Sequence, residues 1–350
     1  MTDLRIALDA MSGDHGAAVV LPAASQVLAE RPDLTLLIVG DESQIGAEVT
    51  ALNSRHPGRV ELLHADEVVG MAELPSRALR GKKRSSMRLA INAVKAGQAH
   101  ACVSAGNTGA LMATARFVLK TLPHIDRPAI ISRIPSLNGY TLMLDLGANV
   151  ECTADHLVQF AAMGDVVAHA VHGQASPRVA LLNIGEEEIK GNDAIREAGQ
   201  RLADSDLNYI GYVEGTDVFL GDVDVVVCDG FSGNVALKSS EGVAKLIGTL
   251  LREEFSRNAL TKLSALAARP VLKSFARRID PGNYNGASFV GLQGTVIKSH
   301  GSADIKAFAN AIRIALVEID YDVPRKIESL LASSLGAVAQ QGVTPQQAAS

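Results

Sequence analysis

The chain has 350 residues, of which 33 are basic and 38 are acidic, and its formal net charge is −5. An acidic chain with few aromatic residues and no tryptophan lacks the basic surface and stacking platforms of nucleic-acid-binding proteins, so we expect no nucleic-acid partner. No apolar run approaches the roughly 18 residues that cross a bilayer. The three cysteines have no metal-ligand spacing. We therefore expect a cytoplasmic protein without a metal site.

Short apolar segments alternate with helical patterns along most of the chain. We predict strands at 5–8, 34–39, 60–63, 100–103, 128–133, 140–145, 178–182, 208–213, 223–228 and 295–297. We predict helices at 17–30, 87–96, 155–171 and 192–204, with others ending near 53 and 251 and a last one over about 304–331; 66–86 reads as irregular. This alternation is typical of a three-layer α/β/α fold with a mostly parallel, doubly wound sheet. We expect one α/β domain over residues 1–333 and a disordered tail over 334–350.

Four glycine-containing polar loops follow predicted strands and precede helices. They contain Asp9, Gly13 and His15 in the first loop; Ser104, Gly106, Asn107, Thr108 and Gly109 in the second; Asp229, Ser232, Gly233, Asn234 and Lys238 in the third; and Lys298, His300, Gly301 and Ser302 in the fourth. A further glycine loop carries Asp145 and Asn149. Glycines let the backbone approach a ligand, and the free N–H groups at a helix start attract anions.

Any one of these loops alone is equally well explained as an ordinary strand-to-helix turn with a good cap. Several together favour a shared site, because an α/β sheet binds its ligands at the carboxyl ends of its strands. We therefore predict a pocket for a phosphate or a phosphorylated group. Which loop holds the phosphate is left open by the sequence.

Two segments are strongly basic. The first, Lys82-Lys83-Arg84, is either a solvated loop or a patch that binds an acidic partner. The second, residues 255–279, has six cations and no acid, and we expect Pro270 to split it into a protruding basic amphipathic helical hairpin. The hairpin would contact an anionic membrane or an acidic protein, or pack on the body or a second subunit. The contact residues in this segment would be Lys262, Leu263, Leu266, Arg269, Lys273, Phe275, Arg277 and Arg278.

Several common motifs are missing from the sequence. No two glycines are spaced G-x-G, so the dinucleotide fingerprint cannot occur, and no P-loop is complete. There is no H-E-x-x-H metal motif and no G-x-S-x-G nucleophile elbow. The glycine loops would therefore handle phosphate without a nucleotide, a hydride cofactor or any other cofactor.

The motifs, taken together and in order, resemble a known family. The bacterial phosphate acyltransferases of phospholipid synthesis, or acyl-ACP:phosphate acyltransferases, are similar to this chain at residues 9–15, 82–87, 104–110, 126–128, 145–150, 229–238 and 296–304. The resemblance runs from about residue 4 to 331. The chain departs from the family pattern at Ser12 and Asn285, which stand where a glycine is usual, and at Gly16-Ala17, where Ala-Pro is usual.

The resemblance implies a catalytic domain that transfers a fatty acyl group from acyl carrier protein to inorganic phosphate, yielding acyl phosphate. It also implies a homodimer, peripheral association with the inner face of the cell membrane, and a functional link to the next glycerol-phosphate acyltransferase. A thioester and an acyl phosphate have comparable transfer potential, so the reaction requires no ATP. Asn107, Asn234 or loop N–H groups would stabilise the oxyanion, and His15, Lys298 or His300 would assist the leaving thiolate.

Three alternatives remain open at this stage. One is a phosphate acetyltransferase that uses acyl-CoA, and another is a non-catalytic scaffold that docks carrier protein or membrane. The third, a dehydrogenase of similar fold, would require tight NAD binding. A covalent route through Cys102 or Cys228 is disfavoured, because burial suppresses thiolate formation.

Overall fold

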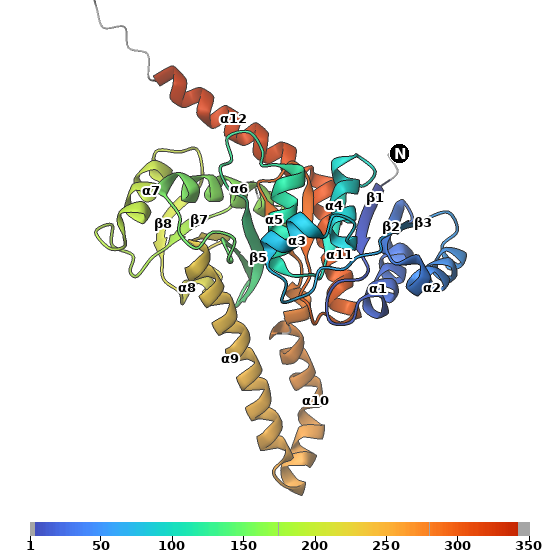
Figure 1. The fold of residues 1–350 in the computed structure, drawn as a ribbon. Helices are drawn as coiled ribbons and strands as arrows, with labels where there is room; N and C mark the ends of the chain where they lie inside the picture. Colours follow the sequence, from blue (N-terminus) through green and yellow to red (C-terminus); the bar gives the residue numbers. More distant parts are fainter. Residues whose placement is uncertain (1–3, 174, 280, 342–350) are drawn as a thin grey trace, which may run out of the picture.

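The computed structural model describes residues 4–173, 175–279 and 281–341, and its centre is one sheet of eleven strands (Figure 1). The strand order is β3-β2-β1-β4-β11-β10-β5-β6-β9-β7-β8. The strands are β1 (Leu4–Asp9), β2 (Leu34–Gly40), β3 (Val60–His64), β4 (Ala101–Ser104), β5 (Ala129–Ser136), β6 (Gly139–Leu144), β7 (Val179–Leu182), β8 (Tyr209–Val213), β9 (Val225–Val227), β10 (Ala287–Val290) and β11 (Thr295–Lys298).

Most neighbouring strands are parallel, as the sequence predicts. β1 runs parallel to β2 and β4, and β4 runs parallel to β11, with Ser104 opposite Lys298. The parallel order is interrupted in the middle, where β10 is antiparallel to both β11 and β5, and β5 is antiparallel to β6. The carboxyl ends of β1, β4 and β11 therefore meet at one edge of the sheet, which brings three of the predicted loops together.

Helices cover both faces of the sheet. They are α1 (Ala17–Glu30), α2 (Glu42–Arg55), α3 (Pro75–Gly81), α4 (Ser86–Lys95), α5 (Thr108–Leu119), α6 (Ala154–His172), α7 (Asp193–Ala203), α8 (Asp217–Leu220), α9 (Gly230–Ser256), α10 (Ala259–Ile279), α11 (Ile305–Tyr321) and α12 (Val323–Gln341), with a 3-10 turn at Pro281–Tyr284. Alternate residues of one strand enter opposite cores: in β1, Ile6 and Leu8 pack towards α1 and α11, and Ala7 packs towards α4 and α5. This double burial confirms the three-layer α/β/α fold.

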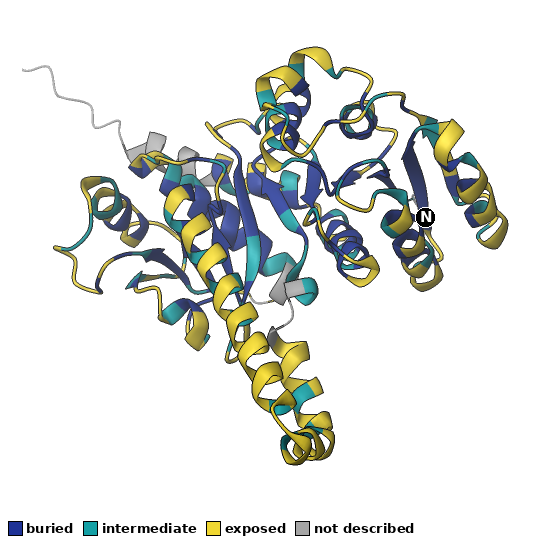
Figure 2. Cartoon of the chain, turned by 60° about the horizontal axis from the view of Figure 1, so that its bottom comes forward, coloured by how far each residue is buried: buried dark blue, intermediate teal, exposed yellow. Residues whose placement is uncertain are grey.

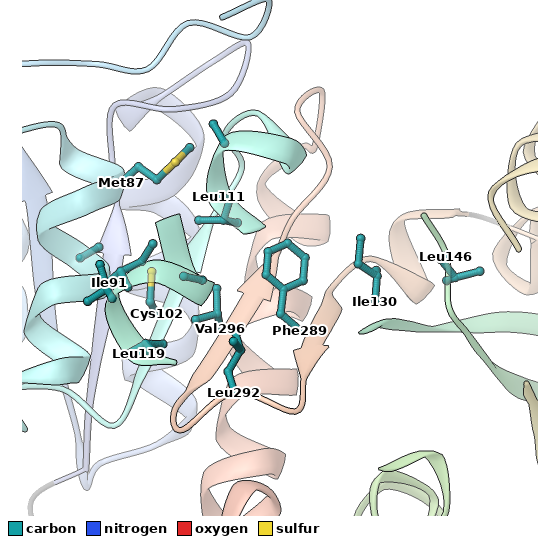
Figure 3. Close-up of a cluster of buried hydrophobic side chains, with 14 of the residues drawn as sticks. Met87, Ile91, Cys102, Leu111, Leu119, Ile130, Leu146, Phe289, Leu292 and Val296 are labelled. Atoms are coloured by element: carbon teal, nitrogen blue, oxygen red, sulfur yellow. The ribbon is translucent and has the colours of Figure 1, made fainter. Parts of the chain in front are cut away.

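One core cluster extends across both halves of the sheet. It includes Met87 from α4, Leu111 from α5 and Phe289 from β10 (Figure 3). Ile130 from β5 and Leu146 after β6 continue the same cluster towards the second half (Figure 3). Side chains on the β4–β11 side of the sheet and on the β5–β6 side therefore pack in one continuous hydrophobic cluster.

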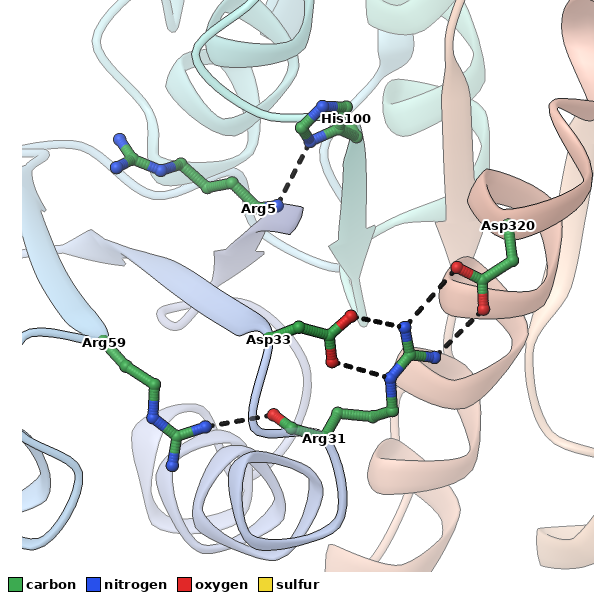
Figure 4. Close-up of polar contacts among 6 residues, drawn as sticks. All are labelled: Arg5, Arg31, Asp33, Arg59, His100 and Asp320. Carbon is green, nitrogen blue, oxygen red and sulfur yellow. Dashed lines mark hydrogen bonds and ion pairs between the residues drawn. The ribbon is translucent and has the colours of Figure 1, made fainter. Parts of the chain in front are cut away.

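Arg31 links α1 to α11, the two helices that follow the first and fourth loops. Its guanidinium, at the end of α1, pairs with Asp33 before β2 (2.9 Å) and with Asp320 near the end of α11 (3.0 Å) (Figure 4). Arg59 donates to the Arg31 carbonyl (3.0 Å) and so ties the start of β3 to the same point (Figure 4). These bonds hold α1 against α11, and the N-termini of these two helices carry the first and fourth loops.

The helical hairpin differs from the one predicted at 255–279. α10 is one continuous helix with Pro270 inside it, and its partner is the distal part of α9 (Figure 1). The prediction that Pro270 divides this segment is wrong. Both helices of the hairpin are largely exposed where they leave the body (Figure 2). No helix among the described residues is both long and apolar enough to span a bilayer.

Two other helical predictions need correction. The segment 66–86, read as irregular, contains α3. The helix expected over 304–331 is two helices, since Asp322 adopts a left-handed backbone conformation (φ 54°) and ends α11. α12 continues to Gln341, so the first part of the predicted tail is helical, and residues 342–350 lie outside the described part of the chain.

Candidate functional site

Asp9 and Ser104 form the buried base of a site at the carboxyl ends of β1 and β4. The Ser104 hydroxyl donates to Asp9 Oδ2 (2.6 Å) and accepts the N–H of Gly106 (3.1 Å). Asp9 is fully buried, as is Ser104. Gly106 has no room for a side chain, because a Cβ there would lie 2.4 Å from Met87 Cε and 3.0 Å from Ser12 Oγ. Through its bonds to Asp9 and Gly106, the Ser104 hydroxyl therefore links the first loop to the second.

The first loop also touches the fourth. Asp14 donates its N–H to the carbonyl of Gly301 (2.8 Å). Gly13 has a positive φ of 83°, and a Cβ at this position would lie 2.8 Å from Ala105 Cβ and 3.0 Å from the Gly301 oxygen. The glycine thus permits close approach of the three loops, as its place in the sequence predicts.

Lys298, the last residue of β11, has its ammonium group buried among these loops. Its Nζ donates to the carbonyl of Ala105 (3.4 Å) and to the carbonyl of Ser299. Loss of solvent lowers the pKa of Lys298 to about 8; the nearby Asp9 carboxylate opposes that shift, while the charge of Lys238 adds to it. A cation held by two carbonyls in a dry site can attract an anion strongly.

His300 lies on the same loop and is exposed at its rim. Its Nδ1 lies 2.9 Å from Ser302 Oγ and accepts the N–H of Ser302 (3.2 Å). Burial of part of the ring, followed by the charges of Lys238 and Lys298, lowers the pKa of His300 below its usual value of 6.5. The imidazole is therefore mainly neutral at pH 7.

Asn285 is a residue of this site whose contacts the sequence did not predict. It lies between the 3-10 turn and β10, and its side chain hydrogen-bonds Ser299 Oγ (2.8 Å), the Ala307 carbonyl (2.7 Å) and the His300 N–H (2.8 Å). The only signal in the sequence was its departure from the glycine usual in the family. The departure marked the position but gave no indication of these partners.

The third loop starts α9 as the pattern predicts. Asp229 is the N-cap: its carboxylate accepts the N–H of Ser232 (2.8 Å) and the Ser232 hydroxyl (2.8 Å). Gly230 donates its N–H to the carbonyl of Asn149 (2.7 Å). Gly233 is packed so closely that a Cβ there would lie 1.9 Å from the Asp145 carbonyl oxygen. The helix start is thus pressed directly onto the loop after β6.

Asp145 is the fixed centre of that loop. Its carboxylate is fully buried and accepts four bonds: from the N–H of Ile130 (2.9 Å), of Ala148 (3.0 Å) and of Asn149 (2.6 Å), and from Asn149 Nδ2 (3.0 Å). Asn149 Nδ2 also donates to the Pro128 carbonyl (2.9 Å). Both side chains are occupied within the protein, so they shape the loop and its contact with α9.

Lys238 of α9 is close enough to the Lys298 loop for its positive charge to act on two groups there. The charge of Lys238, in the third turn of α9, contributes to the lowered pKa of both Lys298 and His300. Lys238 itself pairs with Glu241 (2.8 Å). Asn234 is exposed one turn earlier, with its Cβ next to Gly147. Within α9, Lys238 therefore acts on the Lys298 loop through its charge, whereas Asn234 lies beside the loop after β6.

Some predicted residues lie in other surroundings. His15 is exposed and lines a shallow hollow of about 640 Å³ with Ala18, Asp304 and Lys306, between α1 and the start of α11. Asn107 caps α5 through Ala110 N–H (2.9 Å), and its amide donates to the carbonyl of Met71 (2.7 Å), so this side chain is committed to structure. Thr108 and Gly109 are exposed in the first turn of α5.

The basic segment Lys82–Arg84 is partly neutralised by acidic neighbours. Arg84 pairs with Asp66 (2.9 Å), and Lys82 lies 4.0 Å from Glu67. Lys83 is exposed. Among the residues that the structure describes, no acidic side chain pairs with a cation of α10, so α10 presents the less compensated charge of the two basic segments.

Cys102 and Cys228 are buried, and loss of solvent raises the pKa of both thiols well above the usual value. This agrees with the expectation that neither serves as a nucleophile. Within the described residues, no three His, Cys, Asp or Glu side chains are grouped so as to hold a metal ion.

Residues 4–326 match the profile of the family described as fatty acid synthesis protein. The chain is 60% identical over 334 residues to the phosphate acyltransferase of Alkalilimnicola ehrlichii, covering 95% of this chain and 98% of that one. It is 59% identical over 328 residues to the phosphate acyltransferase of Nitrosococcus oceani, covering 94% and 96%.

Solved structures share the fold at low identity. The EutD phosphotransacetylase from Staphylococcus aureus has a TM-score of 0.58 at 19% identity, and a phosphotransacetylase from Streptococcus pyogenes has a TM-score of 0.61 at 17% identity. Each comparison covers 91% of this chain and 94% of the other. From the sequence comparisons we conclude that the chain belongs to the phosphate acyltransferase family of fatty acid synthesis proteins, and that it is an enzyme that transfers an acyl group to phosphate.

Proposed function

We propose that this enzyme moves a fatty acyl group from the thioester of acyl carrier protein to inorganic phosphate and releases acyl phosphate for phospholipid synthesis. The observation that carries the proposal is the buried ammonium of Lys298, enclosed by the loops after β1, β4 and β11 and facing α9. A phosphate oxygen attacks the thioester carbonyl carbon, and the tetrahedral intermediate then breaks its C–S bond. The thiolate of the carrier protein leaves and takes up a proton.

Lys298 holds the phosphate in this mechanism. Its positive charge compensates the anion, and its burial strengthens the attraction while replacing part of the solvent shell of the phosphate. With a pKa near 8, Lys298 is also a suitable donor of the proton that the leaving thiolate requires. The neutral ring of His300 would accept a proton from phosphate at the rim of the site.

The N-terminal part of α9 supplies the other wall. Asn234 is exposed there and would donate to the developing oxyanion, and Lys238 adds positive charge opposite Lys298. Gly13, Gly106, Gly233 and Gly301 shape the loops, while Asp9 and Ser104 fix the base beneath the phosphate. Asp145, Asn149, Asp229 and Ser232 would act indirectly, by fixing the start of α9.

The hairpin is the surface that we assign to larger partners. Leu263 and Leu266 of α10 are each 64% exposed, near the basic side chains Lys262 and Arg269. Lys273, Phe275, Arg277 and Arg278 continue this surface towards the body. It suits an acidic carrier protein or an anionic membrane, and Lys82–Arg84 would be a lesser carrier contact.

The cellular setting follows from the same proposal. We place the enzyme in the cytoplasm as a homodimer that associates peripherally with the inner face of the membrane. Acyl phosphate is reactive and carries a long acyl chain, so it would be passed there to the next glycerol-phosphate acyltransferase.

The direct test is an assay of acyl phosphate formation, trapped with hydroxylamine, with long-chain acyl-ACP or acetyl-CoA as the donor. We expect turnover with acyl-ACP and phosphate, little with acetyl-CoA, and strong loss in Lys298→Met and Asn234→Ala. Lys95→Met, an exposed lysine at the end of α4, is the matched control and should keep full activity. Full activity in both site variants would refute the site, and a preference for acetyl-CoA would refute the substrate.

A further inference from the structure

Asn285 contacts three different parts of the Lys298 site through one side chain. Its Nδ2 donates to Ser299 Oγ and to the Ala307 carbonyl, and its Oδ1 accepts the His300 N–H. Ser299 begins the link between β11 and α11, and Ala307 lies in the first turn of α11. The amide therefore fixes the start of that link relative to the first turn of α11.

The peptide unit between Ser299 and His300 shows why this matters for Lys298. The N–H of this peptide donates to Asn285 Oδ1, and its carbonyl oxygen, on Ser299, accepts from Lys298 Nζ. Asn285 thus holds one side of a peptide whose other side binds the buried ammonium. A rotation of this peptide would move the acceptor of Lys298 directly.

The backbone on either side of Asn285 is held against α11. Asn310, in α11, donates from Nδ2 to the carbonyls of Asn283 (2.9 Å) and Asn285 (3.0 Å). Gly286 has a φ of 115°, and a Cβ there would lie 3.0 Å from Ala311 Cα, so the segment lies tightly on α11. The side-chain bonds of Asn285 therefore start from an anchored backbone.

We propose that Asn285 is a positioning residue for the phosphate site. It fixes the Ser299–His300 peptide, which keeps the Lys298 ammonium group in its orientation and shielded from water. This inference rests on the proposed function of Lys298. Asn285 touches no reacting atom in this scheme and acts only through its neighbours. Removal of its amide should let the loop move and admit water to Lys298.

The electrostatic surroundings give a measurable consequence. Lys298 faces Asp9 from β1, Asp14 from the first loop and Lys238 from α9, and desolvation is the largest influence on it. His300 faces Lys238 and Glu241 from α9, Asp14, and Lys298. Asn285→Ala changes none of these charges, so a shift in the alkaline limb of the pH–rate profile would report water reaching Lys298. That limb should move to higher pH.

The test compares Asn285→Ala with a matched control, Asn208→Ala. The Asn208 amide also bridges two segments, since it donates to the Ser176 carbonyl (3.1 Å), but it lies away from the site. In Asn285→Ala we expect kcat/KM for phosphate to fall about 10- to 100-fold, the alkaline limb to shift upward, and the His300 amide to exchange hydrogen faster. Asn208→Ala should leave all three unchanged. A purely structural role would lower the midpoint of unfolding without moving the pH profile.

The two levels of the proposal can fail separately. If the wild-type enzyme shows no phosphate-dependent acyl transfer, the proposed function is wrong. If the wild type is active and Asn285→Ala keeps its kcat/KM and pH profile, the positioning role is wrong. Should Asn285→Ala not fold, Asn310→Ala removes the two bonds that anchor the segment and should change the same readouts in the same direction to a smaller extent.

Discussion

Lys298 shows how a single side chain acquires its chemistry from its surroundings. A lysine at the surface stays charged beyond pH 10, but at the end of β11 it is nearly enclosed by the loops that follow β1 and β4. Burial removes the water that stabilises its charge, while Asp9 and two carbonyl groups retain part of that stabilisation. The outcome is an ammonium group that can lose its proton near pH 8.

From this we predict that acyl transfer declines as the pH rises through about 8, because deprotonated Lys298 no longer attracts phosphate. The measurement is kcat/KM for phosphate between pH 6.5 and 10. In Lys298→Met the alkaline limb should be absent and the residual rate should be lower throughout. An unchanged limb in this variant would assign the titration to another group.

The lowered pKa of Lys298 also gives an independent check on stability. The folded chain binds this proton less tightly than the unfolded chain, whose lysine titrates near 10.5. Between about pH 8 and 10.5 the unfolded state therefore binds more protons, and the free energy of unfolding should rise with pH, by at most about 1.4 kcal/mol per pH unit. Below pH 8 both states carry the charge, and this dependence should vanish.

At the scale of the element, α9 has two different parts. Its first turns are pressed against the Asp145 loop and border the Lys298 site, whereas its distal turns leave the body and pair with α10 (Figure 1). Over its 27 residues the helix is about 40 Å long. One rigid element therefore connects the site to the exposed tip of the hairpin.

Two glycines of α9 separate these parts experimentally. Gly233→Ala places a Cβ against the Asp145 carbonyl oxygen and should lower the free energy of unfolding by about 3 kcal/mol. Gly242→Ala has open space around the new methyl group and should raise it by about 0.5–1 kcal/mol, because alanine favours helix. Both are read from denaturant unfolding curves. Equal effects at the two positions would contradict the close packing at Gly233.

The sequence is informative about α9 and α10 only in part. The start of a helix after the strand at 223–228, and the glycines at 230 and 233 that allow close approach, could be recognised from the sequence because those features are local. The continuity of α10 could not be predicted from the sequence, because Pro270 lacks the N–H for one helical hydrogen bond and therefore indicates a break in the helix. The helix continues through it as it lies against α9, a contact between segments that no local pattern reveals.

At the scale of the whole molecule, the site depends on pairings between distant segments. The strand pattern predicted the alternating fold and a shared site for four loops at the carboxyl ends of parallel strands. The loops after β1, β4 and β11 do meet at one edge, but β9 runs antiparallel to these strands, so the loop that starts α9 leaves the sheet at the other edge. The pairing of β10 between β11 and β5 was beyond the sequence, and it is this pairing that brings Asn285 to Ser299 and His300. Long-range polar contacts of this kind lack a local signature.

The hairpin projects from the packed body and is largely exposed (Figure 2). Apolar side chains remain exposed along both helices, including Leu246 and Leu250 of α9 and Leu263 and Leu266 of α10, whereas the sheet is covered on both faces. Exposed apolar groups next to five cations of α10 suit an anionic membrane surface. Chemistry and docking would then be carried by different parts of the chain.

We therefore predict that Leu263→Glu with Leu266→Glu separates the two activities. Binding to vesicles that contain anionic lipid, measured by co-sedimentation, should fall at least tenfold, because two apolar contacts are lost and two negative charges are added beside the membrane. Transfer from soluble acyl-ACP should keep its kcat, since Lys298 and the start of α9 are untouched. The matched control is Ile184→Glu with Ile189→Glu, two comparably exposed residues in the loop after β7. If both pairs reduce vesicle binding equally, net charge rather than the hairpin governs it; if the hairpin pair instead raises KM for acyl-ACP and leaves vesicle binding intact, α10 receives the carrier protein.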